Sequence, residues 1–322
     1  MKVIVLGAGA YGCSLATVLN ENRHSVTLWT PFEKDVKFLT ENRESPKLPN
    51  VKLPKELKFT SNMEEVKKAD LIIIAIPTAY LNDVAKKLKK HYENKPICIA
   101  TKGIEQGSCR FVYDILKENL NTEKLAVISG PSFAVDIANN APVGLSLASQ
   151  DKETIDIVTK ALSNKRFKLR KTNDIVGVEI CGAIKNVIAI ASGIISGMNA
   201  SDSTKAMFIT ESLHDIKSLI KGLGSDGDTV LTYAGFGDLL LTATSSKSRN
   251  FSLGYLIGKG ESKETIDEYI KNTTIEGLYT LKSINDLVKD KDVEMPMINL
   301  IEKIIYENEK PTKLIDFLIE KE

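Results

Sequence analysis

The chain opens with Met1-Lys2-Val3-Ile4-Val5-Leu6-Gly7-Ala8-Gly9-Ala10-Tyr11-Gly12, an apolar strand that runs directly into spaced glycines. A helix pattern follows, with an apolar side formed by Leu15, Ala16, Val18 and Leu19. The order predicts a dinucleotide-binding turn: Gly7 permits the bend, Gly9 admits a pyrophosphate, and Gly12 lets the helix pack on its strand. The helix N-terminus would also attract the phosphate charge. A glycine-rich structural turn is the alternative, since such turns occur in many loops.

The composition is that of an ordinary globular protein and excludes several function classes. Hydrophobic residues make up 43% and charged residues 26% of the chain, and 322 residues suit two domains. The net charge of +1 offers no broad attraction to nucleic acid or to an anionic membrane. The basic cluster at 86–90 is interpreted as the solvated face of a helix. We therefore expect no nucleic-acid partner.

The cysteines and histidines show no metal-binding spacing. We expect free thiols of a reducing cytoplasm at Cys13, Cys98, Cys109 and Cys181, and no metal site at His24, His91 or His214. The chain begins with a strand and not with a cleavable leader. Its longest apolar stretch, 183–197, is interrupted by Lys185 and Asn186 and is shorter than the roughly 20 residues of a span. We therefore predict a buried helix and no membrane span.

Two kinds of pattern divide the chain near residue 172. Strands are predicted before that point, at 1–6, 25–29, 70–77, 97–100, 125–129, 144–148 and 166–170, with helical patterns between them. Helices are predicted after it, at 175–198, 204–221, 251–259, 276–289, 297–307 and 311–320. The fold class is therefore α/β: a doubly wound parallel sheet over 1–172, followed by an all-helical domain over 173–322.

Two strand ends of the predicted sheet carry polar residues. In open α/β folds, ligands bind beyond the carboxyl ends of the strands. Lys102, in Ala100-Thr101-Lys102-Gly103, is placed there to meet a phosphate or polarise a carbonyl, with a surface lysine as the alternative. Ser132 follows the next strand in Ser129-Gly130-Pro131-Ser132, where it would cap a helix, contact a ligand, or do both.

The end of the second predicted strand leaves the cofactor preference open. A carboxylate at this point favours NAD, and an arginine favours NADP. Trp29-Thr30-Pro31-Phe32 supplies neither, and Glu33 and Lys34 follow. Lys34 is a candidate for a 2′-phosphate, although a solvated surface lysine is the simpler interpretation.

Lys185 lies on a face of small residues in the predicted helix 175–198. Gly182, Ala189, Ser192 and Ser196 share that face, and isoleucines cover the opposite side. A cation in such a groove is costly unless it meets an anion, a carbonyl or a carboxylate. We favour a functional lysine over one that extends its amine to solvent.

Asp238 and Arg249 are the remaining candidates in the helical part. Asp238 stands alone in an apolar run after Gly237, where it either caps a helix or pairs with Lys185 if the two helices meet. Arg249, in Ser248-Arg249-Asn250, suits a phosphate because its planar guanidinium forms paired hydrogen bonds. A solvent-facing arginine is the alternative.

Taken together, these segments resemble the bacterial-type NAD(P)-dependent glycerol-3-phosphate dehydrogenases. The resemblance extends from the glycine turn to Met295-Pro296. It is carried by 100–103, 127–134, Gly182-Ala183-Ile184-Lys185-Asn186-Val187-Ile188-Ala189-Ile190, 237–239, 248–250 and 275–277. It implies a Rossmann domain followed by a helical domain, with the site in the cleft between them. It also implies a homodimer in the cytoplasm whose product, sn-glycerol 3-phosphate, is a precursor for phospholipid biosynthesis.

The resemblance also implies residue roles. Lys185 would exchange a proton with the substrate oxygen, with Lys102 and Asp238 beside it as the other catalytic residues. Substrate contacts would come from Lys102, Gly130, Ser132, Lys185, Asp238, Ser248, Arg249 and Asn250. NAD or NADP would contact Gly7, Gly9, Ala10, Tyr11, Gly12, Lys102, Ala134, Arg249 and Glu276. The implied reaction is hydride transfer between NAD(P)H and dihydroxyacetone phosphate. The alternatives are a dehydrogenase for a hydroxy acid and a dinucleotide sensor without turnover.

The chain departs from the family pattern at three places. Ser203 replaces a common Asn, and Ile209-Thr210-Glu211-Ser212 replaces Ile-Thr-Arg-Gly, which reverses a charge at Glu211. Cys181 stands where glycine is usual, one residue before Gly182.

Overall fold

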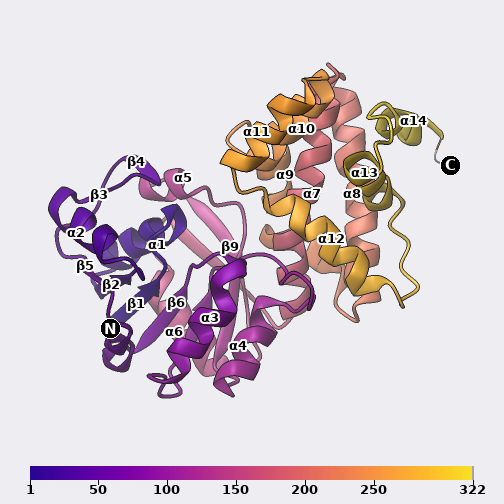
Figure 1. Cartoon of the computed structure of the whole chain (residues 1–322). Coiled ribbons are helices and arrows are strands. Elements are labelled where there is room, and N and C mark those ends of the chain that lie inside the picture. The colour runs from indigo at the N-terminus through magenta and orange to yellow at the C-terminus, as the bar shows by residue number, and fades with distance from the viewer. Residues whose placement is uncertain (321–322) are drawn as a thin grey trace. The chain divides into compact units, whose positions relative to one another are not determined.

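The computed structural model describes residues 1–320, so the last two residues of the predicted helical domain, 321–322, lie outside the described residues. The chain forms two compact units (Figure 1). The first comprises Met1–Lys102 and Arg110–Ile175. The second comprises Gly103–Cys109 and the chain from Val176 onward.

The first unit is built on one eight-stranded sheet with the order β10-β9-β8-β7-β6-β1-β2-β5. The strands are β1 (Lys2–Leu6), β2 (Ser25–Trp29), β5 (Lys58–Thr60), β6 (Leu71–Ile74), β7 (Ile97–Ile99), β8 (Leu125–Ser129), β9 (Val143–Ala148) and β10 (Phe167–Thr172). A separate hairpin contains β3 (Glu44–Ser45) and β4 (Leu48–Lys52). The central strands β6, β7 and β8 are buried throughout, as their continuous apolar sequence predicts.

The sheet is not parallel throughout, which corrects the predicted topology at one edge. β9 pairs with β8 in antiparallel orientation, and β10 is parallel to β9. The segment between β8 and β9 contains only the five-residue helix α5 (Ala134–Ala138). A parallel connection normally needs a longer crossover helix, so the chain turns back beside β8 instead.

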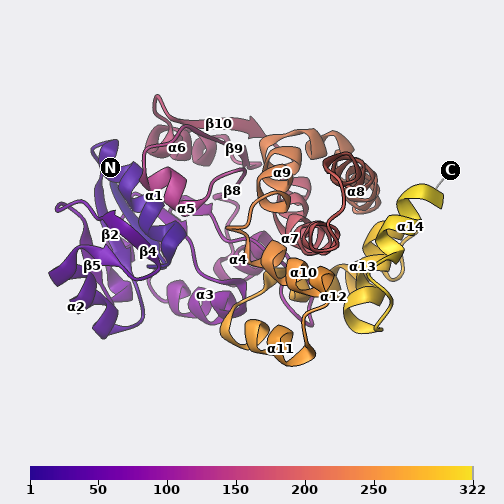
Figure 2. The same ribbon diagram turned by 90° about the horizontal axis from the view of Figure 1, so that it is seen from above.

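Helices cover both faces of the sheet. They are α1 (Ala10–Glu21), α2 (Glu33–Asn42), α3 (Leu81–Lys89), α4 (Val112–Leu120), α5 and α6 (Lys152–Leu162), with 3₁₀ turns η1 (Met63–Lys68) and η2 (Thr78–Tyr80). α1 contacts α5 and α6, whereas α3 contacts α4. Figure 2 shows these two groups on opposite sides of the sheet, as expected for a doubly wound fold.

The second unit is helical. Its helices are α7 (Ile175–Gly197), α8 (Asp202–Gly222), α9 (Asp238–Ala243), α10 (Arg249–Lys259), α11 (Lys263–Asn272), α12 (Glu276–Val288), α13 (Pro296–Tyr306) and α14 (Lys313–Glu320), with short turns η3 (Gly227–Leu231) and η4 (Tyr233–Gly237). α11 was not predicted from the sequence. Ile266, Tyr269 and Ile270 have helical spacing in it, but they form a short apolar stripe and no residue of the helix is fully buried.

α7 is the core helix of this unit. It is long and apolar enough to cross a membrane, but 94% of its apolar window is buried within the protein. It packs closely on α10 through glycines: a Cβ on Gly254 would lie 1.8 Å from the Ile190 carbonyl oxygen, and one on Gly193 would lie 2.1 Å from that of Phe251. α7 is therefore the buried helix that the sequence predicts.

Candidate active site

The glycine turn of the first unit has the shape that a dinucleotide phosphate requires. Gly7 has a φ of +120°, and a Cβ there would lie 2.3 Å from the Ala75 carbonyl oxygen. A Cβ on Gly12 would lie 1.9 Å from the Gly7 carbonyl oxygen, so this glycine permits close packing of α1 on β1. Gly9 differs, because nothing lies within 4 Å of its Cβ position and no side chain caps α1 there. The open space and the uncapped helix N-terminus fit a pyrophosphate.

A hydrogen bond joins this turn to the end of β8. The Tyr11 hydroxyl lies 3.0 Å from the Ser132 Oγ, although the two residues are 121 positions apart. Ser132 also donates to the Gly130 carbonyl oxygen at 2.9 Å. The capping interpretation of Ser132 is wrong, because α5 begins at Ala134 after Phe133 and has no side-chain cap. Ser132 instead connects two segments to which the resemblance assigns ligand contacts.

Lys102 follows β7 and has a firmly held backbone. Its carbonyl oxygen accepts a hydrogen bond from the Thr78 hydroxyl at 2.8 Å. The preceding Thr101 hydroxyl donates to the Ile76 carbonyl oxygen at 2.7 Å and accepts from the Ile76 N–H at 3.2 Å. These contacts tie the ends of β6 and β7 together. Sequence reasoning missed Thr78 and Thr101, although Thr101 stood in the quoted Ala100-Thr101-Lys102-Gly103 segment.

The end of β2 is consistent with the undecided cofactor preference. Phe32 is exposed, and the Lys34 Nζ lies 5.9 Å from the centre of its ring. Thr30 is buried, and its N–H donates to the Thr60 carbonyl oxygen. The ammonium of Lys34 lies close to an exposed aromatic ring. This position fits both interpretations from the sequence, a partner for a 2′-phosphate and a solvated surface lysine.

In the second unit, Lys185 and Asp238 form a buried ion pair. The Lys185 Nζ lies 2.6 Å from the Asp238 Oδ1, with side chains only 12% and 2% exposed. The sequence predicted that Lys185 and Asp238 would pair if their helices met. This prediction is confirmed, because α7 and α9 bring the two side chains together. A lysine extended to solvent is excluded by the same contact. Removing two charges from water is expensive, so an ion pair kept at this depth is better explained by chemistry than by stability.

Asp238 does not cap its own helix. α9 has Gly237 as its cap residue and no side-chain cap, while Asp238 itself is the first helical residue. The Thr242 hydroxyl, one turn later, donates to the Asp238 carbonyl oxygen at 2.7 Å and lies 3.5 Å from Oδ1. The carboxylate is therefore oriented by both Lys185 and the turn that follows it.

The Ser248-Arg249-Asn250 segment forms the N-terminus of α10. This helix begins two residues earlier than predicted, because the Ser248 Oγ accepts from the Phe251 N–H and caps it. Arg249 occupies the first helical position and is exposed, while its carbonyl oxygen accepts from the Tyr269 hydroxyl. A guanidinium at a helix N-terminus suits a phosphate, because the guanidinium carries a full positive charge and the helix N-terminus a partial one.

Asn250, by contrast, is buried and takes part in a network. It contacts Asn186 on α7 and Gly277 on α12, and Asn186 in turn contacts Glu276. The structure thus brings together two residues that the resemblance assigned to different ligands, Asn250 and Glu276. In the sequence, Asn186 stood out as an interruption of an apolar stretch and as part of the segment from Gly182 to Ile190 that carries the resemblance, but it was assigned no role.

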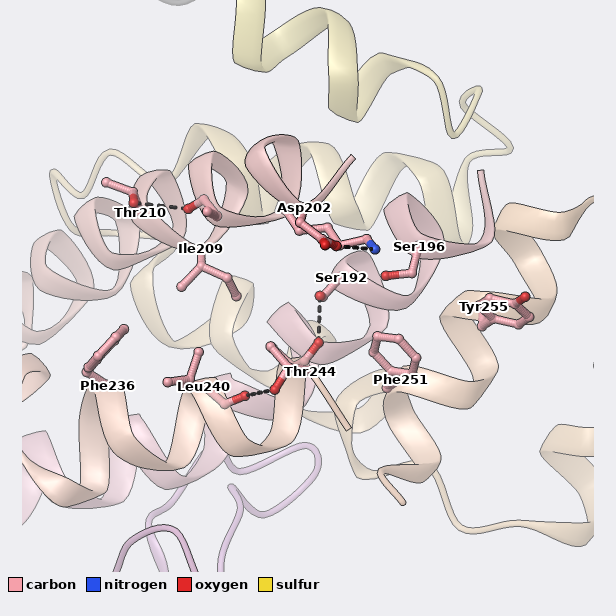
Figure 3. Close-up of a pocket in the computed structure, with 13 residues that line it drawn as sticks. Ser192, Ser196, Asp202, Ile209, Thr210, Phe236, Leu240, Thr244, Phe251 and Tyr255 are labelled. Carbon is pink, nitrogen blue, oxygen red and sulfur yellow. Dashed lines mark hydrogen bonds and ion pairs between the residues drawn. The ribbon is translucent and has the colours of Figure 1, made fainter. Parts of the chain in front are cut away.

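The small-residue face of α7 continues into a hollow beyond Lys185. A hollow of about 620 Å³ is lined by Ser192 and Ser196, with Ile209, Leu240, Phe251 and Tyr255 among its walls (Figure 3). Ser192 donates to the Ala243 carbonyl oxygen, and Thr244 donates to that of Leu240. These two hydroxyls are engaged by helix carbonyls, and the charged groups among the lining residues are Asp202 and Lys205, which form an ion pair at 3.1 Å.

The remaining sequence expectations concern thiols, metals and departures from the family. All four cysteines are free, and burial raises the pKa of Cys13 to about 11. Within residues 1–320, no group of His, Cys, Asp and Glu is arranged to hold a metal ion. Ser203 is exposed in the first turn of α8, Glu211 is half-buried on the same helix, and Cys181 is buried in α7.

Comparison with known proteins agrees with these two units. The first matches the model of the NAD-dependent glycerol-3-phosphate dehydrogenase N-terminus over residues 2–155, and the second matches that of the C-terminus over 174–316. A glycerol-3-phosphate dehydrogenase [NAD(P)+] of Fusobacterium nucleatum is 35% identical over 326 residues, covering 99% of this chain and 96% of the relative. One of Staphylococcus aureus is 35% identical over 327 residues, covering 100% and 98%.

A solved structure gives the same result. The crystal structure of glycerol-3-phosphate dehydrogenase from Coxiella burnetii superposes with a TM-score of 0.91 at 31% identity, covering 99% of both chains. Together with a Rossmann-type unit that has an open glycine turn, these matches identify the chain as a nicotinamide-dependent oxidoreductase. The chain belongs to the NAD-dependent glycerol-3-phosphate dehydrogenase family.

Proposed function

We propose that this chain reduces the C2 carbonyl of dihydroxyacetone phosphate with NAD(P)H and produces sn-glycerol 3-phosphate, reversibly. The observation that carries the assignment of the chemistry is the Lys185–Asp238 pair at 2.6 Å. The bound dinucleotide supplies the hydride. The residues of this chain bind, orient and supply the proton.

The first unit binds the cofactor. Gly7, Gly9, Ala10, Tyr11 and Gly12 hold its pyrophosphate at the N-terminus of α1. Ala134 and Lys102 contribute further contacts. This assignment is supported by the open space beside Gly9 and by the Tyr11–Ser132 hydrogen bond.

The second unit protonates the substrate and binds its phosphate. Lys185 donates a proton to the C2 oxygen as negative charge develops there, and Asp238 holds the ammonium in position. Arg249, Ser248 and Asn250 bind the phosphate at the N-terminus of α10. Lys102, Gly130 and Ser132 supply the remaining substrate contacts, and Glu276 and Arg249 the remaining cofactor contacts. Fixing both ends of the substrate places the carbonyl for hydride transfer.

The direct test follows the loss of reduced-cofactor absorbance with dihydroxyacetone phosphate, using NADH and NADPH in parallel. Turnover with this substrate supports the proposal, and the ratio of the two rates gives the cofactor preference. Turnover with 2-oxo acids but not with the phosphate ester would establish the hydroxy-acid alternative. Binding of NADH without its consumption by either substrate would establish a sensor.

We further propose a homodimer in the cytoplasm. The homodimer is what the family resemblance implies, and free, largely buried cysteines fit a reducing compartment. Sedimentation of the purified chain would give the oligomeric state, and a monomer at the concentration of the assay would refute the dimer.

A further inference from the structure

A closed circuit of hydrogen bonds lies next to Lys185. The Asn186 Nδ2 donates to the Glu276 Oε2 at 3.1 Å, and the Asn186 Oδ1 accepts from the Asn250 Nδ2 at 3.0 Å. The Asn250 Oδ1 accepts from the Gly277 N–H at 2.9 Å. Because Gly277 directly follows Glu276, the circuit starts and ends at the N-terminus of α12.

The orientation of both carboxamides is fixed by the two ends of this circuit. The Gly277 N–H is always a donor, so the oxygen of Asn250 faces it and the nitrogen of Asn250 faces Asn186. The oxygen of Asn186 must then face Asn250, which leaves its nitrogen to face the Glu276 carboxylate. Each assignment agrees with the next, and rotating one carboxamide by half a turn would set like groups against each other.

The circuit is tightly enclosed. Asn186 and Asn250 are 5% and 7% exposed, respectively. A Cβ on Gly277 would lie 2.8 Å from the Asn250 Oδ1 and 2.6 Å from the Asn186 carbonyl oxygen. The circuit therefore has little room to adjust at one point without moving at another.

We propose that Asn186 is a positioning residue that couples cofactor binding to binding of the substrate phosphate. The inference rests on the proposed function, in which Glu276 contacts the cofactor and Asn250 the phosphate. A cofactor that orients the Glu276 carboxylate also orients the Asn186 amide, and Asn186 then holds Asn250 in place for the phosphate. Because coupling is reciprocal, the substrate strengthens cofactor binding by the same factor.

The test measures the dissociation constant of NADH with and without saturating glycerol 3-phosphate, a pair that cannot react. We expect the second ligand to tighten NADH binding by a factor within the usual range, about 5-fold to 150-fold. Asn186→Leu should reduce that factor to near one. Asn299→Leu, the same substitution at an exposed position of α13 outside the circuit, is the control and should keep it.

Three further variants separate coupling from packing. Asn186→Asp keeps the side-chain shape but replaces the donating amide by a carboxylate that faces the Glu276 carboxylate. The factor should therefore fall at a pH where both groups are ionised, while circular dichroism stays unchanged. Adding Glu276→Gln to this variant restores the bond with donor and acceptor exchanged, and the factor should recover. Gly277→Ala removes no hydrogen-bonding group but crowds the circuit, so it should also lower the factor.

The outcomes distinguish this inference from the proposed function. If the wild-type chain turns over dihydroxyacetone phosphate and shows a factor of one, the inference fails and the function stands. If Asn186→Leu and Asn186→Asp both fold and keep the wild-type factor, Asn186 does not couple the ligands. If the wild-type chain does not turn over this substrate, the proposed function fails regardless of the binding factor.

Discussion

Replacing Lys185 by methionine should abolish turnover and also destabilise the helical unit. At 2.6 Å and an effective dielectric constant of about 20, the Lys185–Asp238 attraction is about 6 kcal/mol, and it is offset by the cost of burying both charges. Lys185→Met removes the ion-pair partner of the Asp238 carboxylate, which is 2% exposed. Loss of one partner of a buried ion pair lowers the free energy of unfolding by about 3–5 kcal/mol. That loss is a large share of the roughly 5–15 kcal/mol that stabilises a typical protein.

The double variant Lys185→Met with Asp238→Leu is the decisive comparison. Because it removes both charges together, its free energy of unfolding should lie within about 2 kcal/mol of the wild-type value, although it remains inactive. The changes in the free energy of unfolding caused by Lys185→Met alone and Asp238→Leu alone should therefore sum to much more than the change in the double variant.

Two spectroscopic signals weight the two units differently. Far-ultraviolet circular dichroism during urea unfolding reports mainly on the helices, most of which belong to the second unit. Fluorescence of Trp29, the single tryptophan, reports on the first unit and serves as the internal control. The reasoning is refuted if Lys185→Met unfolds at the wild-type urea concentration, or if the effects of the two substitutions add.

Three other predictions concern the first unit and the thiols. Burial, and to a smaller extent the nearby N-terminal amine, lower the pKa of His24 from 6.5. The unfolded chain therefore takes up a proton more readily than the folded chain, so the free energy of unfolding should fall as the pH drops below 6.5. His24→Gln should flatten this pH dependence in thermal melts followed by Trp29 fluorescence. Gly9→Ala should weaken NADH binding, measured by titration, without changing the melting temperature. Gly12→Ala should lower the free energy of unfolding, measured with urea, by about 1–3 kcal/mol. The interpretation is contradicted if both variants weaken NADH binding equally and neither loses stability. Iodoacetamide should label Cys109 slowly in the folded chain and the other three thiols only on unfolding, as mass spectrometry of labelled peptides would show, and labelling of Cys13 at the same rate would count against its burial.

The sequence predicted those parts of the fold that depend on local pattern. The glycine turn, the buried central strands and the long helix α7 were all evident, because each has a strong period or an apolar run. The reversal at β9 was not, since strand direction depends on the length and path of the connection and not on the strand itself. Likewise, no pattern indicates that 103–109 groups with the helical unit.

The candidate site was predictable as a set of residues but not as a set of contacts. Lys185 and Asp238 were each conspicuous as single charges in apolar surroundings, and their pairing depended on whether α7 and α9 meet. Asn186 was harder to recognise, because a buried carboxamide has no sequence signature beyond its polarity. Its role depends on Asn250 and Gly277, which lie far along the chain and approach it only in the folded unit.

The most direct test of the account compares dihydroxyacetone phosphate with dihydroxyacetone, which lacks the phosphate, in the wild-type chain and in Arg249→Met. The quantity measured is the ratio of kcat/KM for the two substrates. A charged hydrogen-bonded contact contributes about 1.5–3 kcal/mol, so the ratio should fall by about 10-fold to 150-fold in the variant. Loss of the cofactor contact of Arg249 would affect both substrates alike, so the change in the ratio reports the phosphate contact. An unchanged ratio would mean that Arg249 does not bind the phosphate, and it would contradict the assignment of the helical unit to the substrate.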